Sequence, residues 1–363
     1  MAIDYAQNVI GSSAYSALAK KRGINGESAS VGASVGAVEI NAIETDVQAI
    51  LTACEANATL AALSGTATAG DQITQALRGA TESVFSGVDM SQFTDSSPVS
   101  LSNAALSVLA LYVACKAIMD TTAGGSGIAN DKNAVISAAF SALSTNRGTS
   151  GIVSSATTGG VYNDSRLQAL VVDVTAVLTA YNASTNSVIT TIRAAEYTAG
   201  TKQIEALRGA VEAVFNNQSV DLLTPTEIVA LFDVVSLLYT PLLATMGTNL
   251  GTNSIASSAF SSLAAQRGIS NVTSATDPRI DSADSVFVDL GNVLSAYVAN
   301  SAFVATIGAP TEGAPAVQAA RAAFESVFTG LDITAQTSAE LASIITVCST
   351  LYNSSIANMG PVV

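Results

Sequence analysis

One ordered set of four landmarks occurs three times along the chain, and it constrains the fold more than any other feature. The landmarks are an aromatic residue with Arg-Gly seven residues on, an apolar run that begins with Asp, an Arg with Phe seven residues on, and a Tyr with Met seven residues on. Corresponding landmarks lie 113 to 130 residues apart. Each copy is therefore a domain-sized unit with room for its own core, rather than a short solenoid repeat.

The recurring polar and aromatic positions are candidates for structural roles, because each has a counterpart in every copy. They predict three domains, at residues 1–122, 123–250 and 251–363. The positions are Arg22, Gly23, Asp46, Arg78, Glu82 and Tyr112 in the first copy; Arg147, Gly148, Asp173, Arg208, Glu212 and Tyr239 in the second; and Arg267, Gly268, Asp289, Arg321, Glu325 and Tyr352 in the third.

The periodicity of apolar residues predicts four helices in each unit. In the first helix Ile10, Ala14, Tyr15 and Leu18 share one face. The Arg-Gly pair should end that helix, since Arg suits the last turn and Gly suits the left-handed cap. The remaining helices are expected at 40–63, 70–86 and 99–119, at 164–194, 200–216 and 224–246, and at 283–306, 314–329 and 337–358. The fold class is thus all-α, with three tandem four-helix bundle-like units.

Polar, Gly/Ser/Thr-rich stretches at 24–40, 149–163 and 269–283 are expected to be surface loops. Their sequences differ among the copies, so any specific recognition is expected there. The segments that join the units are short, which favours units in contact. A bent row and a pseudo-threefold cluster are both compatible with them.

The Arg and Glu of the third helix lie four residues apart and share a helical face. One interpretation is an exposed ion pair worth a few tenths of a kcal/mol. The other is a partly buried Arg that also contacts the Asp of the preceding helix, as Arg78 would contact Asp46, and so fixes the register within the unit. In the fourth helix, the Tyr and Met seven residues apart indicate a core face.

Composition excludes several classes of function. The 14 basic residues face 28 acidic ones, for a net charge of −14, and they form no basic stripe, so nucleic acid is not an expected partner. The chain has no His and no recognisable nucleophile motif, which argues against an enzyme and against a metal or cofactor site. The cysteines, Cys54, Cys115 and Cys348, are odd in number and widely spaced, so they are interpreted as core fillers.

The apolar segment between Pro98 and Asp120 is long enough to cross a bilayer. Its counterparts in the other copies contain Asp233, Pro241 and Glu340, so a buried core helix is expected instead of a membrane span. The first residues show no basic region followed by an apolar one, so no secretory signal is expected.

These exclusions favour a structural or interaction protein. The lack of His and Trp, the scarcity of Lys and the abundance of Ala, Ser, Thr and Gly resemble structural proteins of tailed-phage virions, especially marine or cyanophage-like ones. That resemblance implies a capsid- or tail-associated component made in the host cytoplasm, with other structural proteins and copies of itself as partners and no small-molecule substrate. The alternative is a subunit of a cell-surface layer or extracellular filament, or an adhesin.

Overall fold

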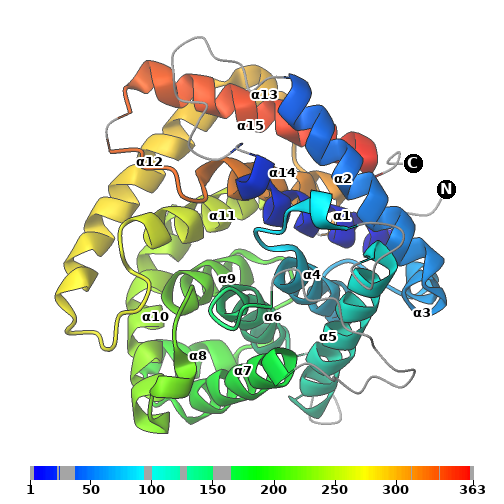
Figure 1. Cartoon of the computed structure of the whole chain (residues 1–363). Helices are drawn as coiled ribbons and strands as arrows, with labels where there is room; N and C mark the ends of the chain where they lie inside the picture. The colour runs from blue at the N-terminus through cyan, green and yellow to red at the C-terminus, as the bar shows by residue number, and fades with distance from the viewer. Residues whose placement is uncertain are drawn as a thin grey trace.

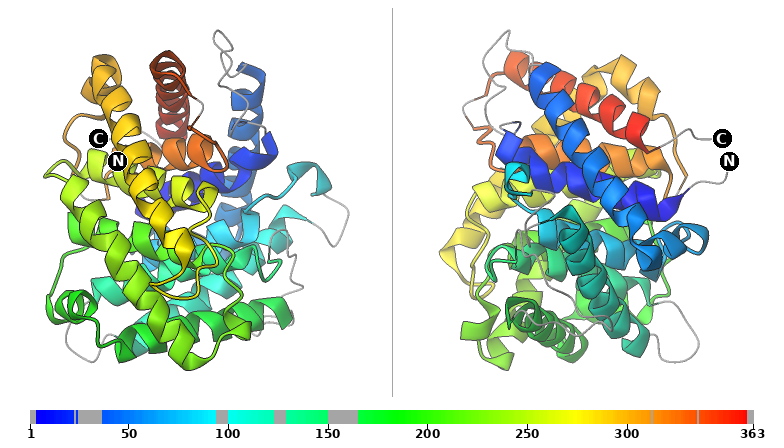
Figure 2. Two further views of the ribbon diagram at one scale, coloured as in Figure 1. Left: turned by 90° about the vertical axis from the view of Figure 1, so that its left-hand side faces the viewer. Right: turned by 45° about the vertical axis from the view of Figure 1, so that its right-hand side comes forward.

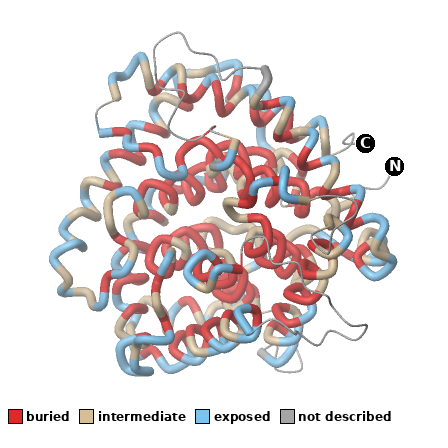
Figure 3. The backbone as a smooth tube through the Cα atoms, in the orientation of Figure 1, coloured by how far each residue is buried: buried red, intermediate tan, exposed pale blue. Residues whose placement is uncertain are grey.

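The fold is all-α, as the sequence predicts. The computed structural model describes residues 4–22, 24, 37–93, 100–122, 129–149, 165–311, 313–334 and 336–359, and no β-strand occurs among them. The helices are arranged in two concentric rings (Figure 1), and the buried residues concentrate in the inner one (Figure 3).

The inner ring is closed and takes two helices from each unit, the first and the third. Each helix in it packs against the next around the ring, and the last packs against the first. In ring order they are α1 (Tyr5–Leu18), α4 (Gln72–Phe85), α6 (Asn130–Ser144), α9 (Lys202–Phe215), α11 (Leu250–Gln266) and α14 (Pro315–Phe328).

The second and fourth helices of each unit form the outer ring. They are α2 (Ala37–Ala56), α5 (Leu101–Thr122), α7 (Ser165–Ala183), α10 (Pro225–Thr245), α12 (Ala283–Ala299) and α15 (Ser338–Asn358). Within a unit the four helices pack in a closed square, as α1, α2, α5 and α4 do. Figure 2 shows α2 and α15, which belong to the first and last units, side by side. The structure therefore selects the pseudo-threefold cluster over the bent row.

Adjacent inner helices from different units run parallel, as three sets of hydrogen bonds between α4 and α6 show. Ser137 Oγ donates to the Gln75 carbonyl at 2.8 Å, Ser83 Oγ donates to the Phe140 carbonyl at 2.9 Å, and Ser141 Oγ donates to the Glu82 carboxylate. Residue numbers rise together on both helices. Within a unit, the Gly87 amide donates to the Ala17 carbonyl, which brings the C-terminal ends of α1 and α4 together. One end of the inner ring thus gathers helix N-termini and the other gathers C-termini.

Small side chains allow the inner helices to approach closely. A Cβ atom on Gly79 would lie 3.2 Å from Phe140 Cβ, and one on Gly209 would lie 3.0 Å from Ser257 Oγ. The large aromatic landmarks, Tyr15, Phe140 and Phe260, are almost fully buried. The interior combines small residues at helix contacts with aromatic side chains between the rings, and it forms one continuous core.

The predicted second helices are not continuous. Each ends within three residues of an Asn whose side chain accepts hydrogen bonds from the backbone of a short following helix. At the third break the chain bends by 88°. These residues are Asn57, Asn186 and Asn300, and they cap α3 (Ala58–Ala61), α8 (Ser187–Ala194) and α13 (Ser301–Ile307). Apolar periodicity continues across each break, so it does not reveal the break.

The short 3₁₀ helices complete the described elements: η1 (Ala19–Arg22), η2 (Ala62–Gly65), η3 (Met90–Gln92), η4 (Val220–Leu222) and η5 (Pro278–Ser282). The element η5 lies in the third expected loop, where Ile269 and Val272 are fully buried, so that loop is partly packed. Most of the first two expected loops lies outside the described residues.

Two outer helices are long and apolar enough to cross a membrane by length and composition: α5 over Leu101–Thr121 and α10 over Pro225–Thr245. A third span is possible if the segments Pro278–Ala299 and Ser301–Ile307, bent by 88°, are taken together. In the first two, half of the tested window is buried inside the protein. The expectation that these are core helices without a membrane span stays a prediction.

Candidate functional site

The axis of the inner ring holds two layers of charged side chains, one of arginines and one of glutamates. Arg78, Arg208 and Arg321 are 3–7% exposed, and the glutamates four residues further along each helix are 14–15% exposed. The arginine-to-glutamate distances within a helix are 3.8 Å in α4, 3.6 Å in α9 and 3.2 Å in α14. The interpretation as an exposed ion pair is therefore wrong, because these groups face the axis and not the solvent.

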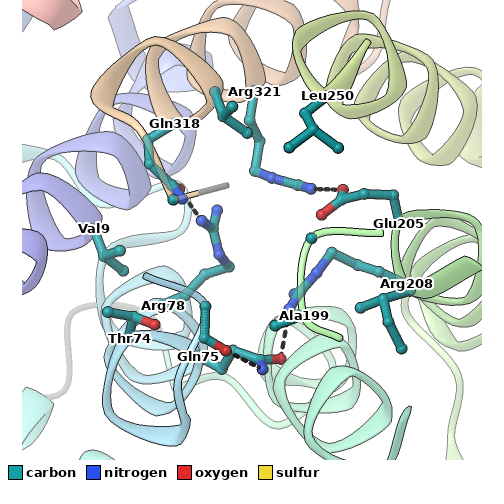
Figure 4. A pocket seen from close by; sticks show the side chains of 15 residues that line it. Val9, Thr74, Gln75, Arg78, Ala199, Glu205, Arg208, Leu250, Gln318 and Arg321 are labelled. Carbon is teal, nitrogen blue, oxygen red and sulfur yellow. Dashed lines mark hydrogen bonds and ion pairs between the residues drawn. The ribbon is translucent and has the colours of Figure 1, made fainter. Parts of the chain in front are cut away.

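Each arginine also reaches the neighbouring unit, always in the same rotational sense. Arg78 donates to Gln318 Oε1, Arg208 donates to Gln75 Oε1 at 3.2 Å, and Arg321 pairs with the Glu205 carboxylate. Gln75, Glu205 and Gln318 occupy the same position, three residues before the arginine of their own helix. The arginine layer consequently joins all three units in a cycle (Figure 4).

Serine hydroxyls from the neighbouring unit satisfy part of the glutamate layer. Ser16 Oγ donates to Glu325 at 2.7 Å, and Ser141 Oγ donates to Glu82. Within the third unit, Ser258 Oγ donates to the other Glu325 oxygen at 3.2 Å. The Ser16 and Ser141 contacts cross between units, so the glutamate layer also holds the ring closed.

Burial and like charges shift the pKa values of both layers. Burial raises the pKa of Glu212 to about 7, against the opposing effect of Arg208, and burial together with Glu325 raises that of Glu82. Burial and the charge of Arg321 lower the pKa of Arg78 to about 10. For Arg321 burial also acts to lower the pKa, but the charges of Glu205 and Glu325 outweigh it and raise the value. Ionisation of the layers is therefore mutually dependent.

A cavity lies at each end of the axial cluster. The cavity at the helix N-termini has a volume of about 50 Å³ and is lined by the three arginines, Glu205 and neighbouring polar groups (Figure 4). The cavity at the C-termini has a volume of about 170 Å³ and is lined by the three glutamates with Ser16, Ser141 and Ser261. Both are small beside the roughly 300–1,000 Å³ typical of drug-sized ligand pockets.

In the alternative interpretation the third-helix Arg is partly buried and contacts the Asp of the preceding helix. The burial is confirmed and the contact is wrong. That Asp pairs instead with the Arg of the Arg-Gly landmark: Arg22 Nε lies 2.6 Å from Asp46, and Arg267 Nε lies 2.7 Å from Asp289. Arg147 pairs with Asp173 in the same way, with 2.6 Å between Nη2 and Oδ1. The physical reason is that the third-helix Arg faces the ring axis, whereas the Asp lies on the outer ring near the C-terminal end of the first helix.

The remaining landmarks lie where the sequence places them. Gly148 and Gly268 have φ angles of +60° and +75°, the left-handed conformation expected of a helix cap; Gly23 lies outside the described residues. Tyr112, Tyr239 and Tyr352 are buried in the outer layer of the core. The capping boxes Thr224–Glu227 and Thr337–Glu340 are both formed.

The axial cluster depends on residues that the sequence analysis did not single out. Serines three residues before each aromatic landmark, Ser12, Ser137 and Ser257, donate to the carbonyls of Gln318, Gln75 and Glu205 at 2.8–3.0 Å. Their recurrence in all three copies is a sequence signal that could have revealed them. Gln75, Glu205 and Gln318 also recur at one position, three residues before each third-helix Arg, and an alignment of the three copies shows this. Only the closed ring shows which unit each of them contacts.

Within the described part of the chain, no group of three or more Cys, Asp or Glu side chains is placed to hold a metal ion. The three cysteines are buried with free thiols, and burial raises the pKa of Cys54 to about 12. A thiol with so high a pKa is a poor nucleophile near neutral pH, because little thiolate is present.

No protein-family model matches the chain, and no match was found among curated proteins or among solved structures.

Proposed function

We propose that the protein is a non-enzymatic structural subunit that assembles with copies of itself or with other structural proteins through its outer helices. The observation that carries the proposal is the character of the outer surface. Val172 on α7 and Val288 and Val298 on α12 are 63–66% exposed, and Leu237 on α10 is 48% exposed.

Several of the residues beside these apolar side chains are small and uncharged, and exposed carboxylates also lie one turn away, Asp284 before Val288 and Asp233 before Leu237. On α7 the exposed neighbours of Val172 include Thr175 and Thr179, and on α12 those of Val288 include Asn292 and Ser295. Side chains of this kind lose little hydration energy when a partner covers them, and the centres of protein interfaces are depleted in charge for the same reason.

The buried charged groups support a structural role as well. The arginines and glutamates on the axis are engaged with one another and with neighbouring units, and the cavities beside them are small. Such a cluster serves to hold three units in one closed body. A virion component, attached to capsid or tail, is the assembly that we propose, on the basis of the compositional resemblance.

The test is the oligomeric state of two surface variants, Val172→Asp and Val288→Asp, measured by light scattering on material whose helical content matches the wild type. We expect the wild type to form concentration-dependent oligomers and both variants to remain monomeric. Ala339→Asp is the control, because it adds the same charge in the first turn of α15, where an acid is tolerated. A monomeric wild type at all concentrations, and its absence from purified virions by mass spectrometry, would contradict the proposal.

A further inference from the structure

The end of the inner ring where the helices begin carries positive charge that the assembly role does not require. The third helices α4, α9 and α14 all begin there, and each is preceded by a glycine with a φ of +66° to +73° that lines the cavity: Gly70, Gly200 and Gly313. Helix N-termini present unpaired amides and a partial positive charge. The backbone thus surrounds this cavity with the positive ends of three helices.

The side chains add to the positive charge around this cavity. Three arginines line the cavity, and Glu205 is the only acidic residue in its wall among the residues that the structure describes. The Cα atoms of the three glutamates lie about one turn, roughly 6 Å, further along the axis. Their carboxylates line the opposite cavity and approach the guanidinium groups to 3.2–3.8 Å. Asp71, at the start of α4, uses its carboxylate to accept from Thr68 and Thr74.

One donor in the cavity wall lacks a hydrogen-bond partner. Nη1 of Arg78 is buried and makes no hydrogen bond; its nearest carboxylate oxygen, on Glu82, is 3.8 Å away. The side chain is 7% exposed. Figure 4 shows its guanidinium extending toward the space between Gln318 and Arg321. A buried guanidinium N–H without an acceptor is costly, so the arrangement suits an added acceptor with negative charge.

We propose that this cavity binds a small tetrahedral oxyanion, of the phosphate or sulfate kind, on the pseudo-threefold axis. Three guanidinium groups that converge from three units match an anion with several equivalent oxygens. The volume of about 50 Å³ is enough for about four water-sized groups, and so for the four oxygens of such an anion.

The anion would contact Arg78 directly and would lie beside Arg208. It would also oppose the effects of burial and of the Arg321 and Arg208 charges, which together lower the pKa of Arg78. Because the three guanidinium groups come from the three units, bound anion would tighten the closure of the ring. This inference is independent of the assembly proposal, since the cavity is internal and the surface valines are not part of it.

Glu205 provides a sharp test, because the other two units have Gln at the equivalent position. Glu205→Gln should therefore fit sterically while it removes the negative charge of Glu205 from the cavity wall. Calorimetric titration of the full chain with sodium sulfate or sodium phosphate, in a chloride buffer of constant ionic strength, measures the affinity. We expect saturable one-to-one binding by the wild type and about tenfold tighter binding by Glu205→Gln, an effect that damage to the fold would not produce.

Arg78→Gln should weaken the binding about tenfold or more, because it removes the unpaired charged donor. Arg22→Gln is the matched control: it removes an arginine that is ion-paired with Asp46 outside the cavity, and it should leave the affinity unchanged. The proposal is overturned if sulfate and phosphate bind no better than chloride, if Glu205→Gln leaves the affinity unchanged, or if the two arginine variants weaken binding equally.

Discussion

Arg208 of the second unit donates a hydrogen bond to the side-chain carbonyl of Gln75 in the first unit, 3.2 Å away on the axis of the protein. The two residues are 133 positions apart in the chain. The same contact recurs between the other pairs of units, with Gln318 and Glu205 as acceptors. A side chain that the sequence suggests as part of a helix-surface ion pair is therefore a link between units.

Removal of one member of the arginine layer should destabilise the whole protein. Arg208→Met leaves Glu212 buried without its closest cation, so we expect a loss of about 3–5 kcal/mol in the free energy of unfolding. Urea denaturation followed by circular dichroism measures it. Lys116→Met is the control, since the Lys116–Asp120 pair is solvent-exposed and its loss should cost less than about 1 kcal/mol. Equal effects of the two variants would show that the axial layer contributes no special stability.

The glutamate layer should make stability depend on pH. Because the folded pKa of Glu212 is about 7 and its ordinary value is 4.5, the folded protein binds more protons than the unfolded chain between these values. Stability should therefore be highest below about pH 4.5 for this group and fall as the pH rises through 7, by up to about 3 kcal/mol. Glu212→Gln should flatten that part of the profile. Parallel pH profiles for the variant and the wild type would contradict the assignment of this pH dependence to Glu212.

The partner of the Asp that recurs in the second helix of each unit can be identified by double-mutant cycles. Arg147 and Asp173 should show a coupling energy of about 1–3 kcal/mol, because their side chains are in direct contact and Asp173 is largely buried. Arg208 and Asp173 share no contact, so their effects should be additive within about 0.5 kcal/mol. A larger coupling for the second pair would restore the sequence-based pairing of the third-helix Arg with this Asp.

Two glycines with similar backbone conformations should differ in their tolerance of a side chain. Gly148→Ala should cost about 1–2 kcal/mol, because its φ is +60° but no atom lies within 4 Å of the added Cβ. Gly313→Ala adds a clash to a similar strain, since the new Cβ would lie 2.6 Å from the Cα of Ala69, so its cost should be larger by about 1–3 kcal/mol. Thermal unfolding of both variants gives the comparison, and equal losses would rule out the close approach.

The local features of the fold could be predicted from the sequence because each depends on neighbours within a turn or two of helix. The apolar face that contains Tyr15, the capping box of Thr224 and Glu227, and the glycine cap at Gly148 follow from helical periodicity and terminal hydrogen bonding. The breaks at Asn57 and its counterparts are equally local, but an Asn inside an apolar pattern is a weak signal when the pattern continues beyond it.

The charged site could be predicted only in part. That Arg and Glu share a face of the third helix follows from their spacing. The spacing does not predict which way that face points, because the packing around the helix decides whether the same pair lies toward solvent or toward an axis. The assignment of Asp46 to Arg78 was wrong for this reason, since both Arg22 and Arg78 were chemically suitable partners.

By itself, the sequence determined that the chain is all-α, which residues start and end many of the helices, and which of their faces are apolar, since these properties depend on interactions within a helix. Only the tertiary structure decided that the three units close into a ring, that the third-helix arginines face its axis, and that each contacts a different unit. Ring closure joins residues that are more than a hundred positions apart, and no local periodicity encodes which of several equivalent partners the closed packing brings together.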